Sequence, residues 1–398
     1  MALLLDSRLL LRKVKDLRCL TPRRNRVKEK WAVTRTKHPP TGLTLQHFDS
    51  TYSVQLGQLW PSVRSALLSE RKYGALINNF SYDAVLADLE AQGCRDFLSD
   101  TDTETRPCLE QESEVAADED VSISKKSEID GQQLSPLHLS PHIKCLVFPR
   151  GDLTRFKPAR PDMCGLLGYY LMDAASLLPC LALDVQEGHN VLDLCAAPGG
   201  KTLALLQTQS IAFLCVNDTS VSRTLRLRKV LNSYVPKPLL TDEKLRITSF
   251  DGTKWGDIER NTFDRVLVDV PCTTDRHSLM EDDNNIFSKS RTGERRRLPQ
   301  LQLELLMAGI EAACPNGEIV YSTCTLSQTQ NQSVVEQAIF LAQENHGIHL
   351  QVVDLRPLTH MFRKTFHFAP DLHLGEMVIP HLAANFGPIY MCKLRRLT

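Results

Sequence analysis

The chain has 398 residues, of which 42% are hydrophobic, and its formal net charge at neutral pH is zero. A chain of this length can bury one large core and still supply a smaller second region. No apolar run approaches the roughly 20 residues that a bilayer-spanning helix needs, which argues against a membrane protein. None of the twelve cysteines form a Cys-x-x-Cys pair, so the sequence disfavours zinc and favours reduced thiols in an intracellular compartment.

Charge is strongly segregated at the start of the chain. Residues 1–37 contain twelve Lys or Arg against three acids, and Leu and Val alternate with the basic residues. This composition predicts a mitochondrial transit peptide over residues 1–30, and hence a protein of the mitochondrial matrix. A solvated basic arm, or a helix that meets RNA phosphates, is the alternative.

Two further segments precede the main domain. Residues 31–95 are expected to form a helical region, because "WPSVRSALLSERKYGALINNF" (60–80) spaces its apolar residues as a helix does and Pro61 suits a first helical turn. Residues 96–140 are expected to be a disordered linker. The part from 96 to 130 carries twelve acids against three bases, and it cannot bury enough apolar surface to offset its ordering entropy.

Residues 141–398 alternate short apolar runs with helical patterns, which predicts a doubly wound, mostly parallel seven-stranded sheet with helices on both faces. A ligand is expected beyond the carboxyl ends of these strands. The expected strands are 190–195, 212–218, 246–252, 264–272, 317–325, 349–355 and 388–394. The expected helices are 201–208, 220–234, 298–313 and 328–344.

The turn after the first strand, "LDLCAAPGGKT", has the spacing of a phosphate-binding loop except that Cys195 replaces its first glycine. Asp218 ends the next strand about twenty residues beyond Gly199, where a carboxylate reaches ribose hydroxyls. Asp251, with Gly252, ends the third strand, where an adenine would pass. These strand ends favour S-adenosylmethionine over a nucleotide with a phosphate chain. The alternatives are a P-loop-like NTPase with magnesium on Asp269, a capping role for Asp218 and a plain turn at Asp251.

Two cysteines, Cys272 in "DVPCTT" and Cys324 in "YSTCT", end neighbouring strands and are expected to converge in one crevice. Carbon 5 of cytosine is a poor nucleophile, but it becomes electron-rich when a thiolate adds at carbon 6. A second thiol can assist the elimination that follows. Asp269 is placed to hydrogen-bond nitrogen 3 and the exocyclic amine, and Lys201 could orient that carboxylate or lower a thiol pKa. Spacing alone leaves open which cysteine attacks.

These motifs, together with "FPRGDLTRFKPARPD" and "YYLMDAASLLPCLAL", resemble those of the Sun-type RNA cytosine-5 methyltransferases, including mitochondrial ribosomal-RNA members. The resemblance implies a Rossmann-like class I methyltransferase fold. It makes Cys324 the covalent nucleophile, Cys272 the residue that assists product release, and Asp269 a third catalytic residue. Gln332 departs from the family, in which a glutamate is common. The residues that the resemblance places at the cofactor or target base are Gly199, Gly200, Lys201, Asp218, Arg223, Asp251, Gly252 and Asp269.

Basic residues between the two cysteine motifs suggest how RNA is held. Lys289, Arg291 and Arg295–Arg297 are expected in a long loop at the edge of the site, where they suit phosphates; a solvated helix start is the alternative. The target base must be unpaired or flipped out. The resemblance implies mitochondrial small-subunit ribosomal RNA as substrate and a helical-repeat partner of the mitochondrial terminator-factor type. A catalytically silent scaffold that recruits such a partner is a further alternative.

Overall fold

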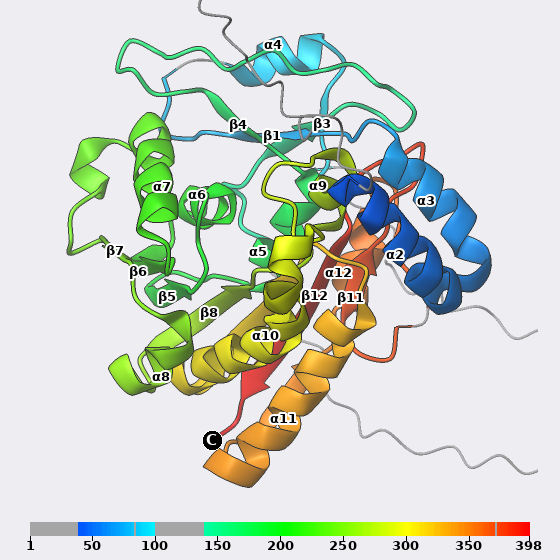
Figure 1. The fold of residues 1–398 in the computed structure, drawn as a ribbon. Helices are drawn as coiled ribbons and strands as arrows, with labels where there is room; N and C mark the ends of the chain where they lie inside the picture. The colour runs from blue at the N-terminus through cyan, green and yellow to red at the C-terminus, as the bar shows by residue number, and fades with distance from the viewer. Residues whose placement is uncertain (1–38, 83–84, 100–138, 371) are drawn as a thin grey trace, which may run out of the picture.

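The computed structural model describes residues 39–82, 85–99, 139–370 and 372–398 (Figure 1). The expected transit peptide at 1–30 lies outside the described residues, as does most of the expected acidic linker, residues 100–138. In the part of the chain that the structure describes, no helix is both long enough and apolar enough to cross a membrane.

All seven strands expected after residue 141 are present in one sheet, which confirms the predicted doubly wound fold. Their order is β10-β12-β9-β8-β5-β6-β7, and all pairs from β9 to β7 are parallel, while β12 runs antiparallel to both neighbours. A short eighth strand, β11 (Glu376–Val378), pairs with β12. The seven strands are β5 (His189–Asp193), β6 (Ile211–Asn217), β7 (Leu245–Thr248), β8 (Phe263–Asp269), β9 (Ala313–Thr323), β10 (Leu350–Val353) and β12 (Ile389–Arg396).

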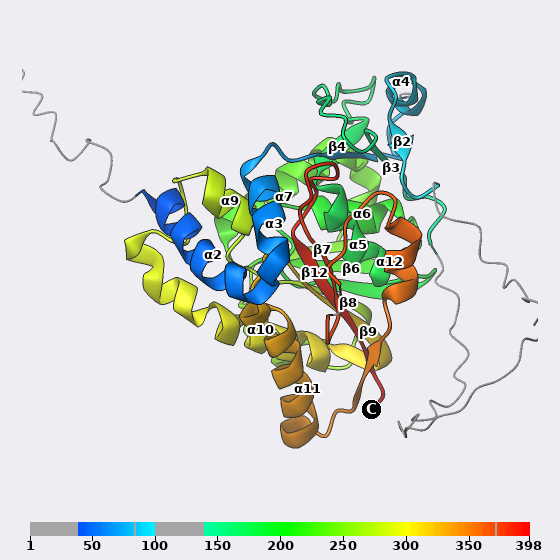
Figure 2. The ribbon, with the colours of Figure 1, turned by 90° about the vertical axis from the view of Figure 1, so that its right-hand side faces the viewer.

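Helices cover both faces of this sheet (Figures 1 and 2). Successive residues of a strand enter different cores: Val191 of β5 packs into one hydrophobic cluster and Leu192 into the other. Because a strand between two helix layers is buried on both faces, its residues are apolar on both faces. The expected strands are therefore nearly continuous apolar runs in the sequence. One face carries α5 (Leu178–Ala182), α6 (Gly200–Gln207), α7 (Val221–Tyr234) and α12 (Arg356–Phe362), and the other carries α8 (Trp255–Ile258), α10 (Thr292–Ala312) and α11 (Gln332–His346).

The amino-terminal region contains the expected helices α2 (Pro40–Leu56) and α3 (Trp60–Leu68), which pack near α9 (Asp275–Met280). The helical pattern predicted up to residue 80 is wrong in its second half. Residues Gly74–Ile77 form strand β1, buried along its whole length. Tertiary pairing explains the difference, because β1 lies between two partner strands that are distant in sequence.

Those partners build a second, antiparallel sheet that the sequence did not predict. Its order is β2-β3-β1-β4, with α4 (Val85–Ala91) beside it. Figure 1 shows this sheet above the large one. Because the acidic stretch separates β2 from β3, the sheet joins segments on both sides of the expected linker. Its strands other than β1 are β2 (Arg95–Asp96), β3 (Cys145–Val147) and β4 (Tyr169–Met172).

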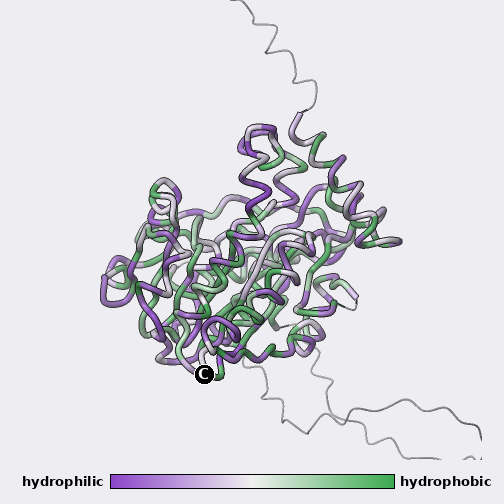
Figure 3. The backbone as a smooth tube through the Cα atoms, turned by 60° about the horizontal axis from the view of Figure 1, so that its bottom comes forward, coloured by the Kyte–Doolittle hydropathy of each residue, from purple (hydrophilic) through white to green (hydrophobic). Residues whose placement is uncertain are grey.

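Hydropathy along the backbone follows this layering. Figure 3 shows hydrophilic segments in the peripheral loops, and hydrophobic segments recur through the interior.

Candidate active site

The strand order of the large sheet reverses at β5, whose neighbours are β6 on one side and β8 on the other. In an open parallel sheet, the crevice beyond the carboxyl ends at such a point is the usual ligand site. A hollow of about 690 Å³ lies there, and Pro198, Arg223, Cys272 and Arg291 line it. The predicted site residues follow the carboxyl ends of five parallel strands and are therefore gathered along this edge.

The glycine turn between β5 and α6 has the conformation that only glycine adopts easily. Gly199 precedes α6 with φ of 115°. A Cβ atom on Gly199 would lie 2.7 Å from Cδ1 of Leu227, and one on Gly200 would lie 3.0 Å from Cε1 of Tyr170. Both glycines are thus required by backbone and packing, and this brings the start of α6 to the cleft.

Sequence reasoning missed Asp193, which ends β5 and is 1% exposed. Its Oδ2 accepts a hydrogen bond from Oγ1 of Thr202 at 2.7 Å, while its Oδ1 is buried without a hydrogen-bond partner among the described residues. Burial, partly offset by the Thr202 hydroxyl, raises the pKa of Asp193 to about 7. The signal was available, since Asp193 belongs to the same "LDLC" motif as Cys195.

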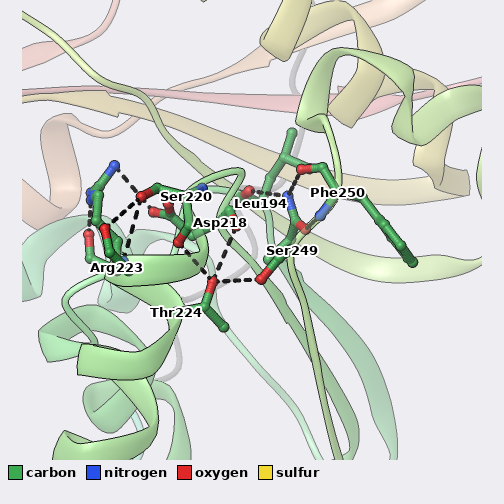
Figure 4. Close-up of polar contacts among 10 residues, drawn as sticks. Leu194, Asp218, Ser220, Arg223, Thr224, Ser249 and Phe250 are labelled. Carbon is green, nitrogen blue, oxygen red and sulfur yellow. Dashed lines mark hydrogen bonds and ion pairs between the residues drawn. The ribbon is translucent and has the colours of Figure 1, made fainter.

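Asp218 and Arg223 lie together at the start of α7 (Figure 4). The Asp218 carboxylate accepts from the amide of Ser220 at 3.0 Å and pairs with Nη1 of Arg223 at 3.1 Å. Nη2 of Arg223 donates to the carbonyl of Ala197 at 2.5 Å. Arg223 therefore links the Asp218 carboxylate at the end of β6 to the turn that follows the neighbouring strand β5, although the Arg223 side chain is 46% exposed.

Asp251 and Gly252 form a turn after β7. Oδ1 of Asp251 accepts from the amide of Thr253 at 3.1 Å and from its hydroxyl at 2.8 Å. A Cβ atom on Gly252 would approach Cδ2 of Leu305 to 2.8 Å, so helix packing requires this glycine. The local geometry is that of the plain turn considered as the alternative interpretation. A contact between Asp251 and adenine stays a prediction. Phe250, whose side chain is 50% exposed, precedes this turn.

Lys201 and Asp269 form an ion pair, with Nζ and Oδ2 separated by 2.9 Å. Oδ1 of Asp269 accepts from the hydroxyl of Ser322 at 2.7 Å. Burial opposes the charge on Lys201, but the carboxylate beside it more than compensates and raises the pKa of Lys201. Lys201, which resembled the lysine of a phosphate-binding loop, is therefore paired with the Asp269 carboxylate, and its charge also acts on Cys324.

The two predicted cysteines meet, with Sγ of Cys272 and Sγ of Cys324 3.2 Å apart. Sγ of Cys272 also accepts from the amide of Thr274 at 3.4 Å and of Cys324 at 3.3 Å. The pKa of Cys324 is lowered, because a hydrogen bond from the Cys272 thiol and the charge of Lys201 outweigh burial and Asp269. The same hydrogen bond and burial raise the pKa of Cys272 well above its usual value, and the Thr274 amide only partly opposes them. A proton held on the Cys272 sulfur thus favours the thiolate form of Cys324.

Behind the thiols lies a buried hydrogen-bond network that the sequence did not reveal. Asp275, fully buried, accepts from Oγ1 of Thr273 at 2.8 Å, from the amide of Leu326 at 2.8 Å and from the hydroxyl of Tyr52 at 2.9 Å. Oγ1 of Thr273 lies 2.8 Å from Oγ1 of Thr325. The network ties both cysteine loops to α2. The only sequence signal was the threonine that follows each cysteine.

The basic residues between the cysteine motifs do not occupy a long loop. Lys289 and Arg291 lie in a short 3₁₀ turn, and Arg295–Arg297 lie in the first turns of α10. The structure therefore agrees with the alternative interpretation, in which these basic residues lie at the start of a helix. Arg291 pairs with Glu294 at 2.6 Å and lines the cleft, and Arg295 lies over the ring of Phe287.

Comparison with known proteins identifies the family. A family model described as 16S rRNA methyltransferase RsmB/F matches residues 180–387. The protein named 5-cytosine rRNA methyltransferase NSUN4 from Xenopus laevis is 52% identical over 400 residues, covering 98% of each chain. The chain belongs to the RsmB/F methyltransferase family. A mouse relative in this group, tRNA (cytosine(34)-C(5))-methyltransferase, mitochondrial, is 35% identical over 358 residues, covering 89% of this chain and 90% of the relative.

The fold of this RsmB/F methyltransferase is shared with a solved methyltransferase homologue from Pyrococcus horikoshii. The two agree with a TM-score of 0.57 at 19% identity, over 91% of this chain and 100% of that one. The chain is thus an enzyme of the class I type, and its methyl donor is S-adenosylmethionine.

The residues of the cleft suit this donor. The sulfonium and ammonium groups of S-adenosylmethionine are positive and its ribose offers hydroxyl donors. The cleft edge supplies the carboxylates of Asp193, Asp218 and Asp251, and one buried oxygen of Asp193 has no hydrogen-bond partner in the described chain. A triphosphate would face like charges there, with Lys201 already paired. The geometry therefore disfavours the NTPase alternative.

Proposed function

We propose that this methyltransferase transfers a methyl group to carbon 5 of a cytosine in RNA through a covalent adduct between Cys324 and carbon 6. The observation that carries the proposal is the pair of half-buried thiols, 3.2 Å apart, at the ends of β8 and β9. Two thiols in contact, with the pKa of one lowered and that of the other raised, provide a nucleophile and a separate proton acceptor.

The residues would act in sequence. The Cys324 thiolate forms a C–S bond to carbon 6, the electron pair of the 5,6 double bond moves through the ring to nitrogen 3, and nitrogen 3 takes up a proton from solvent. The Asp269 carboxylate can then accept hydrogen bonds from this N–H and from the exocyclic amine. S-adenosylmethionine, when bound, supplies an electrophilic methyl group to carbon 5. Cys272, once it has lost its own thiol proton to solvent, then removes the hydrogen from carbon 5 as a thiolate, and nitrogen 3 gives up the proton that it took. The C–S bond breaks, the double bond re-forms, and Cys324 leaves as thiolate.

Other predicted residues would position the donor. Gly199 and Gly200 let the turn before α6 approach it, and Asp218 with Arg223 would bind its ribose end. Asp251 and Gly252 would lie beside the adenine. Lys201 acts on Asp269 and on the charge of Cys324 and is a positioning residue for both.

The substrate that we propose is mitochondrial small-subunit ribosomal RNA, and the location is the mitochondrial matrix, where the modification would support ribosome assembly. The names of two relatives support this proposal, one as an rRNA methyltransferase and one as a mitochondrial enzyme. We also propose a helical-repeat partner of the terminator-factor type that supplies further RNA surface. The chain alone is then expected to bind RNA weakly; tight, specific binding by the isolated chain at physiological salt would argue against the partner.

Transfer of a labelled methyl group into small-subunit ribosomal RNA tests this function. Cys324→Ala is expected to abolish transfer, while Cys314→Ala, a control cysteine in β9 at the opposite end of the sheet, is expected to retain it. Cellular function that survives Cys324→Ala would support the scaffold alternative. Magnesium-dependent nucleotide binding that is lost on Lys201→Ala would support the NTPase alternative.

A further inference from the structure

A second hollow, of about 200 Å³, lies between the small antiparallel sheet and the segments that follow α12 and β11. Four cationic side chains line it, and none of its lining residues is acidic. Three phenylalanines among its lining residues are almost fully buried, so the hollow offers little apolar surface to a partner. The cations are Lys72, Arg95, Arg150 and Lys364.

The positive charge is held in place by the fold. Nζ of Lys72, which is 6% exposed, donates to the carbonyls of Pro149 and Asp152, both at 2.6 Å. Nη1 of Arg150 donates to the carbonyl of Lys364 at 3.3 Å, which links the Pro149 turn to the end of α12. In the part of the chain that the structure describes, neither Arg95 nor Arg150 takes part in an ion pair. Burial lowers the pKa of Lys72, with Asp152 opposing this.

The hollow is linked to the cysteine cleft through two intermediate hollows that share lining residues with their neighbours, and these two are also lined by the acidic residues Glu70, Asp152 and Glu281. His277 lines the cleft and also a neighbouring hollow that contains Arg71 and Tyr73. Arg71 and Tyr73 in turn line a smaller hollow that shares Lys72 with the cationic one. The guanidinium of Arg71 lies 4.5 Å from the centroid of the Tyr73 ring, and this ring is 36% exposed.

We propose that this cationic hollow binds backbone phosphate of the substrate RNA, on the strand that continues from the target cytosine. The inference rests on the proposed function. A target base in reach of a thiol must lie in unpaired RNA, whose flanking nucleotides follow a charged groove and stack on exposed rings. Guanidinium groups such as those of Arg95 and Arg150 bind phosphate, and Tyr73 with Arg71 provides a stacking face on the way. The scarcity of exposed apolar anchors in the hollow argues against a protein partner there.

The salt dependence of RNA binding tests the inference separately from catalysis. Binding of a single-stranded segment of small-subunit ribosomal RNA to the full chain is measured by fluorescence anisotropy over a series of salt concentrations. For single strands, each phosphate contact contributes about 0.7 to the slope of log K against log salt. The double variant Arg95→Gln with Arg150→Gln is therefore expected to bind more weakly at low salt and to lose about 1.4 of this slope.

Matched variants control for net charge and folding. Lys237→Gln with Lys244→Gln removes the same charge from exposed residues before β7, at the opposite end of the sheet, and should keep the wild-type slope. Arg95→Lys with Arg150→Lys should also keep it, and Arg95→Gln alone, which removes no side-chain hydrogen bond of the described chain, should lose about half of the effect. A wild-type slope in the double Gln variant overturns the inference. If the double Gln variant keeps the wild-type slope and the wild-type protein methylates the RNA, the inference fails and the proposed function stands. If the slope falls but the wild-type protein does not methylate the RNA, the proposed function fails.

Discussion

The thiol half of the cleft, at the ends of β8 and β9, is held by buried hydrogen bonds around Asp275, whereas the Asp251 turn of the cofactor half, at the end of β7, lies near solvent. Asp275 is fully buried and accepts from Tyr52 in α2, from Thr273 in the Cys272 loop and from Leu326 in the Cys324 loop. Asp251, in contrast, is exposed and accepts only from Thr253, two residues away.

This contrast follows the chemistry that each half must perform. In the proposed mechanism, bond formation at carbon 6 requires a sulfur atom fixed to a fraction of an ångström, and a closed network provides such fixation. A diffusible cofactor must enter and leave, which suits groups near solvent. Substitutions behind the thiols should therefore cost folding stability as well as activity, whereas substitutions in the exposed Asp251 turn should affect donor binding alone.

The largest effect is expected for Asp275→Ala. This change leaves the Leu326 amide buried without its acceptor and the Tyr52 hydroxyl with the longer contact to Oγ1 of Thr325 at 3.2 Å, and an unsatisfied buried group costs about 1–3 kcal/mol. We expect a loss of about 3 kcal/mol in the free energy of unfolding, measured by urea denaturation, together with loss of methyl transfer. Asp251→Ala is the matched control and should cost much less. Equal stability losses for the two variants would contradict the contrast between the halves.

A smaller effect is expected for Lys201→Met. The lysine ammonium lowers the pKa of Cys324, so its removal should raise that pKa and move the pH profile of adduct formation to higher pH. Because the thiolate exists above the pKa, a rise of about 1 in the pKa of Cys324 should lower the rate at neutral pH about tenfold. Lys201→Arg should retain most of the wild-type profile. A rate that is lower at every pH, with no shift of the pH profile, would show that Lys201 does not act by lowering the pKa of Cys324.

The smallest effect is expected for Arg223→Gln. The guanidinium is 46% exposed and holds Asp218 against the Ala197 carbonyl, and exposed pairs contribute less than about 1 kcal/mol to stability. The KM for S-adenosylmethionine should rise several-fold while the urea midpoint stays unchanged. Steady-state kinetics at varied donor concentration, beside a denaturation curve, measures both. A lowered kcat with unchanged KM would place Arg223 in the chemical step instead.

The sequence was informative wherever a local pattern determined the structure. The strand ends that carry Asp218, Asp269, Cys272 and Cys324 were found because each follows a short apolar run, and the parallel sheet brings such ends together. The convergence of the two thiols was predicted from that rule alone, and only the resemblance assigned their order.

What the sequence did not reveal depends on contacts between distant segments. Strand β1 lies in a stretch that reads as a continuing helix, and its partners β3 and β4 lie beyond the acidic segment. Asp275 has no local signature, because its partners Tyr52 and Leu326 are 223 and 51 residues away. Asp193 was overlooked because the likeness to a phosphate loop draws attention to Cys195 and the glycines.

The most direct test of the account is a covalent trap. Cys272→Ala protein is incubated with small-subunit ribosomal RNA and S-adenosylmethionine, and the mixture is separated on a denaturing gel. Because the variant can form the bond at carbon 6 but lacks the group that assists its release, we predict a denaturation-resistant protein–RNA band that is absent from Cys272→Ala with Cys324→Ala. A variant that turns over without accumulating the band, or a band that persists in the double variant, would contradict the assigned division of labour between the two thiols.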